Sequence, residues 1–446
     1  MSGSRRQASF PSHRKRHRRA APLVEALEGR SLLSVAGTGT PFLATVPILT
    51  TSPGANPAGS GAPAGLSPAQ VRQAYGFNAI RLGGGIVGDG TGQTIAIVDA
   101  FNQPNIKSDL HAFDQQFGLP DPPSFQVVAQ DGSQNLPANA SKGDWGYEIS
   151  LDVEWAHALA PGAKILLVEA ASASDDLNTA VQWAAAQPGV SVVSMSWGSP
   201  EYYGENLDDS IYTTPAGHNG VTFLAATGDT GSPGDYPATS PNVLAVGGTQ
   251  FAASLDAQGD YATETGWNSG GGGVSPYELQ PGYQKGVVTQ SATNRATPDV
   301  SMDSGTGVAV YDSYDASWDW IDVGGTSLAT PCWGALIAIA DQGLAARGQG
   351  TLGNQAAMTG LYALDQKAGS ISFHDITTGS NGLPAGPGYD LVTGIGTPQA
   401  AAIAAGLSGN IPAPTAIGPT GVLSAAPAFQ WSAVAGATAY HLVAYD

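Results

Sequence analysis

The segment GGTSLATP, residues 324–331, places Ser327 directly after a glycine turn, and an apolar run of helical length follows at residues 333–340. Glycine lets the backbone turn sharply and lets another backbone come close. Ser327 is therefore expected at or near the N-terminus of a helix, where backbone N–H groups and the helix dipole favour negative charge. A nucleophilic hydroxyl beside a developing oxyanion fits that position, and so does an ordinary N-cap serine. Taken alone, the motif is more typical of an N-cap, so the rest of the chain has to decide.

Strand-like and helix-like patterns alternate on the N-terminal side of this segment. Ser67 is predicted to cap a first helix that has Pro68 at its first position. Short apolar runs predict strands at residues 94–98, 163–168, 190–195, 221–226 and 243–246. Periodic segments predict helices at residues 107–117, 145–159, 175–186 and near 207–212. This alternation indicates an α/β fold of three layers, with a mainly parallel central sheet and helices on both faces.

Composition divides the chain into four parts. Residues 1–35 are a basic arm, and LEGRSLLS at 27–34 is similar to a short N-terminal motif of large exported bacterial proteins, so we expect an export or targeting role or a plain disordered arm. Residues 36–65 predict a disordered linker, and residues 66–408 hold the alternating pattern. Residues 409–446 predict a Pro-rich linker and a partial β-sandwich that resembles the start of a fibronectin-III-like module, with Trp431 and Tyr440 as core aromatics. We therefore expect the sequence to be a piece of a longer protein.

The charge of the chain limits its partners. The first 30 residues hold eight of the 17 Lys and Arg, so the remainder carries 9 basic and 34 acidic residues and a formal charge of −25. Such a body should repel nucleic acid and anionic membranes. It suits work at low pH, where carboxylates become neutral, and also resembles the surface of soluble extracellular proteins in general. No stretch is predicted to span a membrane, and we expect a secreted or cell-surface, extracytoplasmic protein.

Cys332 is the single cysteine of the sequence. It follows the serine motif at the start of an apolar helix, where a thiol nucleophile could be placed. A buried, unreactive cysteine is the commoner occupant of such a position, and that is our prediction.

Two acidic motifs could carry chemistry beside Ser327. Glu148 and Asp152 lie four residues apart and would share one face of a helix whose other residues are mostly apolar. A carboxylate pair in such surroundings has raised and split pKa values, although a solvated acidic helix is an equal alternative. Asp229, in TGDTG at residues 227–231, follows an apolar strand at the sheet edge where open α/β folds place their sites. By itself it also fits an Asx-turn.

Histidine cannot be assigned as the general base. A subtilisin-type triad needs one, but no histidine stands in a suitable context; those that follow residue 100 are His111, His157, His218, His374 and His441. A serine nucleophile without histidine needs another base, and the pair Glu148 and Asp152 offers one.

At this point an ordered set of motifs resembles the sedolisin family of serine-carboxyl peptidases. The matching pieces, in family order, are LSPAQVRQAYGF (66–77), ExxxD (148–152), APGA (160–163), SMSWG (194–198), GDTG (228–231), YPATSPNVLAVGGT (236–249), PDVS (298–301) and GGTSLATP (324–331). Each motif is weak alone, but their order over residues 66–407 is specific. The resemblance implies a subtilisin-like fold.

The resemblance also implies roles for individual residues. Ser327 would be the nucleophile, Glu148 the base that takes its proton, Asp152 the group that orients Glu148, and Asp229 the group that faces the oxyanion. The substrate backbone would pair with Ser196, Trp197 and Gly198. The chemistry agrees, because a carboxylate base works best near its own pKa of about 4. A carboxyl at position 229 can donate a hydrogen bond only when it is protonated.

Residues 374–397 hold a second constellation. Asp375 and Asp390, with backbone carbonyls in glycine-rich turns, are hard-oxygen ligands suited to Ca²⁺, or a pair of Asx-turns. The segment matches the calcium loop of the family, which implies one structural ion. Its ligand positions would be Asp375, Ile376, Gly386, Gly388 and Asp390.

The leading hypothesis is a secreted, calcium-stabilised serine-type endopeptidase that hydrolyses polypeptides at acid pH, with a monomeric catalytic domain. The alternative is a catalytically inactive surface or binding protein on the same fold, and a neutral-pH subtilisin relative would need a histidine that we cannot place. Two features depart from the family. The 65 residues before the domain read as arm and linker rather than as a folded prosegment, and Thr227 stands where serine is usual. Endopeptidase and tripeptidyl-peptidase action stay open.

Overall fold

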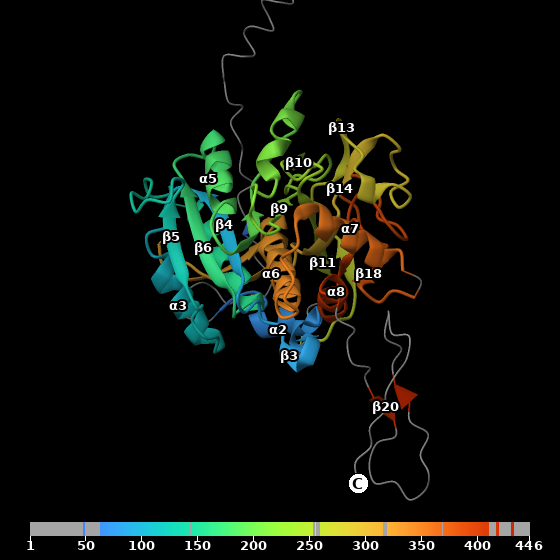
Figure 1. Cartoon of the computed structure of the whole chain (residues 1–446), viewed down its shortest axis with the longest axis horizontal. Helices are drawn as coiled ribbons and strands as arrows, with labels where there is room; N and C mark the ends of the chain where they lie inside the picture. The colour runs from blue at the N-terminus through green and yellow to red at the C-terminus, as the bar shows by residue number, and fades with distance from the viewer. Residues whose placement is uncertain are drawn as a thin grey trace, which may run out of the picture. The chain divides into compact units, whose positions relative to one another are not determined.

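The computed structural model describes most of residues 63–409 as one folded body (Figure 1). The described residues are 63–142, 145–252, 255, 259–314, 319–367 and 369–409, with short strands at β1 (Ile48–Leu49), β20 (Ala416–Gly418) and β21 (Gln430–Trp431). The predicted arm at 1–35 and the strand expected near Tyr440 lie outside them. Within the described residues, no helix is both long enough and apolar enough to cross a membrane.

The centre of the fold is a sheet that has eight strands among the described residues. Its order is β12-β11-β9-β7-β4-β6-β5, and β15 also pairs with β11. Every neighbouring pair is parallel except β11 with β12. The predicted mainly parallel sheet is therefore confirmed. The strands are β4 (Thr94–Ala100), β5 (Phe125–Ala129), β6 (Lys164–Ala170), β7 (Val190–Met195), β9 (Thr222–Ala226), β11 (Leu244–Phe251), β12 (Glu264–Gly266) and β15 (Val300–Asp303).

Helices cover both faces of this sheet, as predicted. The two faces follow from the period of two along each strand: in β4, Ile95 and Ile97 join one apolar cluster, while Ala96 and Val98 join the other. The first cluster packs against α4 (Trp145–Leu159) and α6 (Thr326–Ala345), and the second against α5 (Asp175–Ala185). The remaining helices are α2 (Pro68–Ala74), α3 (Ile106–Phe117), α7 (Asn354–Asp365) and α8 (Ala400–Leu407).

Short hairpins and turns surround the sheet. Short paired strands are β2 (Arg81–Leu82) with β3 (Ile86–Val87), β8 (Ser199–Pro200) with β10 (Asp235–Tyr236), β13 (Gly273–Leu279) with β14 (Asn294–Thr297), β16 (Val308–Tyr311) with β17 (Trp320–Gly324), and β18 (Phe373–His374) with β19 (Thr397–Pro398). The helix expected near residues 207–212 is instead two 3₁₀ turns, η3 (Glu205–Leu207) and η4 (Asp209–Tyr212). Leu207 is exposed, so this segment lacks the continuous apolar face that stabilises an α-helix.

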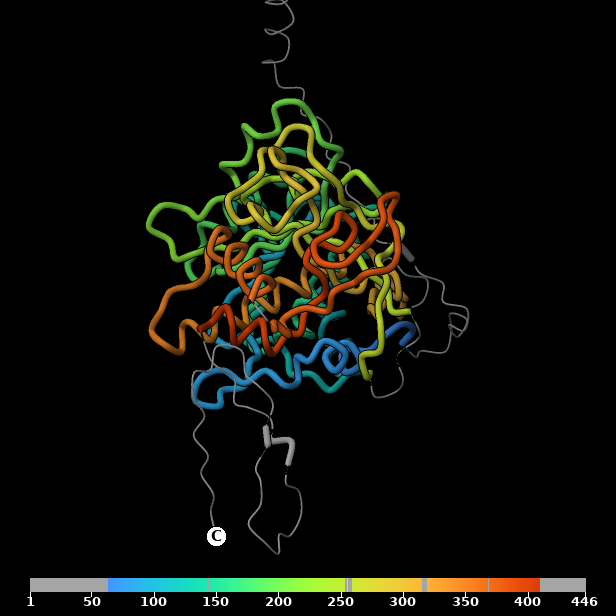
Figure 2. The backbone as a smooth tube through the Cα atoms, turned by 90° about the vertical axis from the view of Figure 1, so that its right-hand side faces the viewer, coloured from blue at the N-terminus to red at the C-terminus, as the bar shows by residue number. Residues whose placement is uncertain are grey.

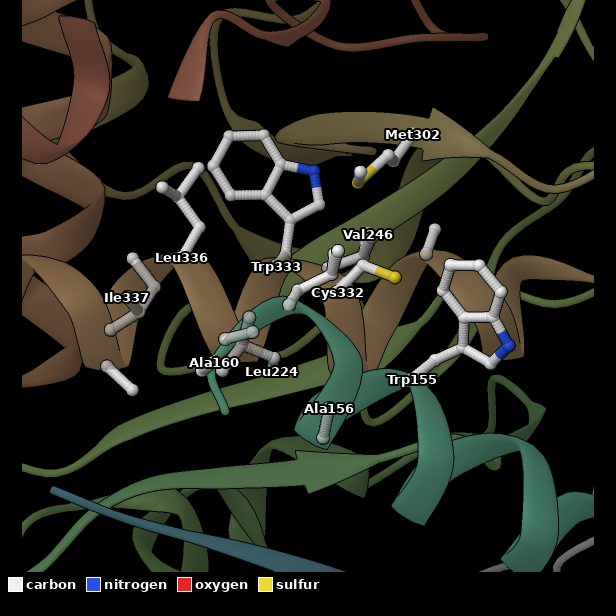
Figure 3. Packing of buried hydrophobic residues seen from close by; sticks show 14 of the residues in the cluster. Trp155, Ala156, Ala160, Leu224, Val246, Met302, Cys332, Trp333, Leu336 and Ile337 are labelled. Atoms are coloured by element: carbon white, nitrogen blue, oxygen red, sulfur yellow. The ribbon is translucent and has the colours of Figure 1, made fainter. Parts of the chain in front are cut away.

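The helix after the serine motif lies in the middle of the larger core. Trp333, Leu336 and Cys332 pack among side chains of the sheet and of α4 (Figure 3). Burial raises the pKa of the Cys332 thiol well above its usual range, so the thiolate needed for nucleophilic chemistry is disfavoured. The geometry therefore agrees with the prediction of an unreactive cysteine.

A buried ion pair supports the strand that carries the PDVS motif. Arg295 Nη2 lies 2.6 Å from Asp299 Oδ2, and both side chains are fully buried. The Tyr362 hydroxyl and the Ala245 N–H also donate to Asp299, at 2.8 and 2.9 Å. Removing one member of such a pair leaves an uncompensated buried charge.

We therefore expect Arg295→Met to lower the free energy of unfolding by about 3–5 kcal/mol. The exposed Lys107→Met in α3 is the matched control, with an expected change within about 0.5 kcal/mol. Urea denaturation of both variants measures the difference. A loss below about 1 kcal/mol in Arg295→Met would show that the pair does not support the fold.

Candidate active site

Three separate elements bring the four predicted catalytic residues together. Glu148 and Asp152 lie one turn apart on α4, Ser327 lies in the first turn of α6, and Asp229 follows β9. α4 packs directly on α6, which places the two carboxyls beside the start of the α6 helix. All four side chains are buried, so α4 is not the solvated acidic helix that the sequence left open.

The nucleophile loop shows why the motif needs its glycine and its proline. Gly325 is the N-cap of α6 and has a φ of 118°, which favours glycine. Ser327 is therefore inside the first turn, and the simple N-cap interpretation is wrong. Pro331 has no N–H to give to the carbonyl of Ser327, four residues earlier. That carbonyl instead lies 3.2 Å from the hydroxyl of Ser196.

Glu148 faces Ser327. The hydroxyl of Ser327 lies close enough to lower the pKa of Glu148, but burial and the nearby charges of Asp152, Asp99 and Asp229 raise that pKa far more. Neither the Glu148 carboxyl nor the Ser327 hydroxyl has a hydrogen-bond partner of normal geometry. The contact is thus looser than proton transfer requires, as is common in unliganded active sites.

Asp152 is linked through Ser196, which lies in the segment predicted to pair with substrate, to α6. The Ser196 hydroxyl lies 2.8 Å from Asp152 Oδ1 and also reaches the Ser327 carbonyl. Burial and the neighbouring Asp99 raise the pKa of Asp152 well above its usual range. A protonated Asp152 can donate to Ser196, whose own proton then points to Ser327. This chain fixes the position of α6 relative to α4.

A further carboxyl, that of Asp99, lies near Glu148 and Asp152 and was not predicted from the sequence. It lies near the carboxyl end of β4, is fully buried, and has no hydrogen-bond partner on either oxygen. Burial raises the pKa of Asp99 to about 7. The signal was an acid at the end of the apolar run TIAIVDA, which is the same signal that singled out Asp229.

Asp229 is held in position by the nucleophile loop. The N–H and the hydroxyl of Thr326 both donate to Asp229 Oδ1 at 2.8 Å. Oδ2 has no partner, and it lies 2.7 Å from the place that a Cβ on Gly325 would occupy. Burial raises the pKa of Asp229 to about 6. A neutral Asp229 therefore has one oxygen fixed and the other free to donate beside Ser327.

The predicted substrate segment lies at the end of β7. Ser196 and Trp197 are fully buried, and the Trp197 indole donates to the Val98 carbonyl of β4 at 2.8 Å. A Cβ on Gly198 would lie 2.8 Å from the Cβ of Asp235, so only glycine fits there. Asp235 was not predicted as a site residue. Burial and the charge of Asp229 raise its pKa to about 7, so Asp235 belongs to the same group of carboxyls.

The predicted calcium segment forms a tight turn outside the sheet, coloured orange-red in Figure 2. The N–H of Gly388 donates to Asp375 at 3.0 Å, and the N–H of Gly386 donates to Asp390 at 2.8 Å. Both carboxylates therefore hold the same turn from two sides. Within the described residues, no group of three or more His, Cys, Asp or Glu side chains could hold a metal, so an ion here would depend on backbone carbonyls such as that of Ile376.

Comparisons with known proteins agree with this architecture. Residues 137–357 match the model of the Subtilase family, Peptidase_S8. Kumamolisin of Bacillus sp. (strain MN-32) is 34% identical over 380 residues, which cover 76% of this chain and 63% of the relative. Sedolisin of Pseudomonas sp. (strain 101) is 29% identical over 71% of this chain and 58% of its own length. Tripeptidyl-peptidase 1 of Mus musculus is 28% identical, with 75% and 63% covered.

The fold of this chain is also similar to that of a solved structure. It is a Pseudomonas sedolisin, a serine-carboxyl proteinase complexed with two molecules of pseudo-iodotyrostatin, with a TM-score of 0.64 and 26% identity over 78% of this chain and 99% of that one. The chain spans 58–63% of the length of the curated relatives named above. The ordered motifs, the sheet topology and these relatives lead to one assignment: the chain belongs to the sedolisin family and has its subtilisin-like fold.

Proposed function

We propose that the protein is a secreted serine-carboxyl endopeptidase that cleaves polypeptides at acid pH. The observation that carries the proposal is that Glu148 faces Ser327 in a buried cluster of carboxyls, while Asp229 is bonded to Thr326, the residue before the nucleophile. One relative is named tripeptidyl-peptidase 1 and one solved structure is titled a serine-carboxyl proteinase, so the mode of cleavage has to be measured. The acidic composition of residues 31–446 supports work at low pH.

In the proposed reaction, the Ser327 oxygen attacks the peptide carbonyl carbon while its proton passes to Glu148. The negative charge that develops on the carbonyl oxygen accepts a hydrogen bond from protonated Asp229. Glu148 then gives its proton to the leaving amine, which leaves an ester on Ser327. Water, deprotonated by Glu148, releases the acid and restores the hydroxyl.

The protonation states require acid. Burial and repulsion among the carboxyls keep protons on the cluster, so it carries little charge when the pH is low. Of the neighbours that affect the pKa of Glu148, Ser327 is the one that favours the ionised form, and the base acts in the fraction of molecules in which Glu148 is ionised. Asp229 must stay neutral to donate.

Digestion of denatured casein between pH 3 and 8 tests this function. We expect internal fragments, released fastest in acid, and mass spectrometry of those fragments distinguishes them from successive tripeptides. Activity that peaks near neutral pH would contradict the carboxylate base. No cleavage at any pH would favour the binding-protein alternative.

The proposal includes one structural Ca²⁺ in the turn held by Asp375 and Asp390. Two carboxylates, with carbonyls of Ile376, Gly386 and Gly388, form the kind of oxygen set that calcium takes. Backbone N–H groups of Gly386 and Gly388 hold both carboxylates within this one turn, which supports its use as the ion site. When bound, the ion would supply stability rather than chemistry, because the turn contains none of the catalytic residues.

We expect calcium at 100 times its dissociation constant to raise the free energy of unfolding by about 2.7 kcal/mol. Thermal unfolding with calcium and with EGTA at pH 6 measures the shift. Asp390→Asn should remove most of the response, and the exposed Asp131→Asn is the control that should keep it. If EGTA leaves the wild-type midpoint unmoved and elemental analysis finds no metal, the segment is a pair of turns.

A further inference from the structure

A cavity of about 300 Å³ opens at the edge of the central sheet opposite the candidate active site. It lies where β4, β6 and β7 begin, at Thr94, Lys164 and Val190. These strands are parallel, so their amino ends share one edge, whereas Ser196 and Asp229 follow the carboxyl ends of β7 and β9 at the other edge. Ligand sites typically enclose roughly 300–1,000 Å³, so this cavity, separate from the catalytic cluster, has room for a small group.

The charge that lines this cavity is opposite to that of the rest of the body. Lys164 lines the cavity, and no Asp or Glu does, although residues 31–446 hold 34 acidic and only 9 basic residues. Lys164 is exposed, and within the part of the chain that the structure describes it forms no ion pair. Its ammonium group is therefore available to an anionic ligand.

A second cationic group lies next to the cavity. His218 Nε2 lies 2.9 Å from the carbonyl of Gln187, which lines the cavity, and Nδ1 lies 2.7 Å from the carbonyl of Asn219. Carbonyl oxygens only accept, so the ring satisfies both when it is doubly protonated and positively charged. The C-terminus of α5 would repel an anion, but its carbonyls already accept hydrogen bonds. Gln187 donates to the carbonyls of Trp183, at 2.8 Å, and Ala184, at 3.1 Å.

The remaining lining suits a peptide group that carries an apolar side chain. The ring of Trp183 forms an apolar wall. It packs on the backbone of Gly132, where φ is 80° and a Cβ would lie 2.1 Å from the ring, so the position of the ring is fixed. Thr94, Ser124 and Gln126 also line the cavity and offer two hydroxyls and an amide. Their side chains have no hydrogen-bond partner among the described residues, which leaves their polar atoms available to a ligand.

We propose that this cavity binds the C-terminal residue of a peptide, with its carboxylate on Lys164 and its apolar or aromatic side chain against Trp183. The hydroxyls and amides of the lining would bond the last peptide group. A free amino acid fits less well, because its α-ammonium group would lie near the positive charges of Lys164 and His218. An inorganic anion would use Lys164 and make no use of the apolar wall. The site is remote from Ser327, so the inference does not rest on the proposed peptidase function.

The test follows binding of small probes to the whole protein through the indole N–H signal of Trp183 in NMR spectra. That signal is identified by its absence from Trp183→Leu, so binding at the active site is not mistaken for binding here. The probes are N-acetyl-phenylalanine, its uncharged amide, N-acetyl-alanine, acetate and free phenylalanine, at pH 6, where an α-carboxyl is ionised. Each is titrated against the wild type, Lys164→Gln and Lys164→Arg. Lys285→Gln, at an exposed lysine that does not line the cavity, is the matched control.

We expect Lys164→Gln to weaken the binding of N-acetyl-phenylalanine at least about tenfold, because one charge-assisted hydrogen bond is lost. Lys164→Arg and Lys285→Gln should stay within about threefold of the wild type, since both keep a cation in the cavity. The uncharged amide should bind the wild type and Lys164→Gln equally, and free phenylalanine should bind more weakly than its acetylated form. Thermal unfolding of each variant checks that it is folded.

Three results would overturn the proposal. They are no saturable shift of the Trp183 signal with N-acetyl-phenylalanine, equal affinity in the wild type and Lys164→Gln, and acetate or N-acetyl-alanine binding as tightly as N-acetyl-phenylalanine. The last result would indicate a simple anion site without the apolar wall. Failure to cleave casein leaves all of these measurements unaffected, so this proposal and the proposed function fail separately.

Discussion

Replacing Ser327 with alanine is expected to lower kcat/KM for a peptide substrate by at least about 10⁴-fold, and Glu148→Gln should do the same. The hydroxyl supplies the atom that bonds to the substrate, and the carboxylate receives its proton. Because the two groups act in one step, the double variant should lose little more than either single one. The residual rate would come from substrate positioning and from Asp229.

Stability measurements separate this result from unfolding. The Ser327 hydroxyl has no hydrogen-bond partner of normal geometry, so Ser327→Ala should remain as stable as the wild type. The folded-state pKa of Glu148 is raised, so its protonated form favours folding, and that contribution is lost as the pH rises toward the raised value. Glu148→Gln, which stays neutral, should therefore be more stable than the wild type near pH 7. Ser108→Ala, on the exposed side of α3, is the control for activity. Retention of more than about a tenth of the activity in either active-site variant would remove that residue from the mechanism.

Asp229→Ala is expected to lower kcat by about 10²–10³-fold, because one donor to the oxyanion is lost. Asp229→Asn should behave differently. Since the pKa of Asp229 is raised to about 6, the wild-type donor is present below that pH and disappears as the pH rises through it. Asparagine donates at any pH, so the variant should keep activity above pH 6 that the wild type loses.

The pH dependence of kcat/KM for the wild type and both variants measures this effect. Asn at position 229 still accepts the N–H of Thr326 through its carbonyl oxygen, so the loop should keep its shape. If kcat/KM of Asp229→Asn falls at the same high pH as that of the wild type, then a group other than Asp229 causes the fall. Asp229 would then not be the proton-dependent donor.

The sequence predicted those parts of the fold that depend on local pattern. The helix at residues 145–159 and the strand at 190–195 agree with the structure residue for residue, because both are long apolar segments with clear ends. The segment at residues 207–212 was predicted as a helix and forms 3₁₀ turns, since its short periodic pattern lacks a buried face.

The site was predictable only where a motif marked it. Ser327, Glu148, Asp152 and Asp229 belong to the ordered motifs, and the structure places them together. Asp99 and Asp235 belong to the same acidic region but lie outside the ordered motifs, although Asp99 ends an apolar strand run much as Asp229 follows one. Their proximity depends on the order of β4, β7 and β9 in the sheet and on the loop after β9, neither of which spacing along the chain reveals.

The most direct test of the central claim is a crystal structure of the protein with a peptide aldehyde, determined at about pH 4. We expect a covalent bond from Ser327 Oγ to the aldehyde carbon, and a Glu148 oxygen within about 2.6–3.2 Å of Ser327 Oγ. Asp229 should lie at hydrogen-bond distance from the new oxygen. An aldehyde bound to Ser327 while Glu148 remains more than about 4 Å away, or bonded to a different residue, would contradict the account.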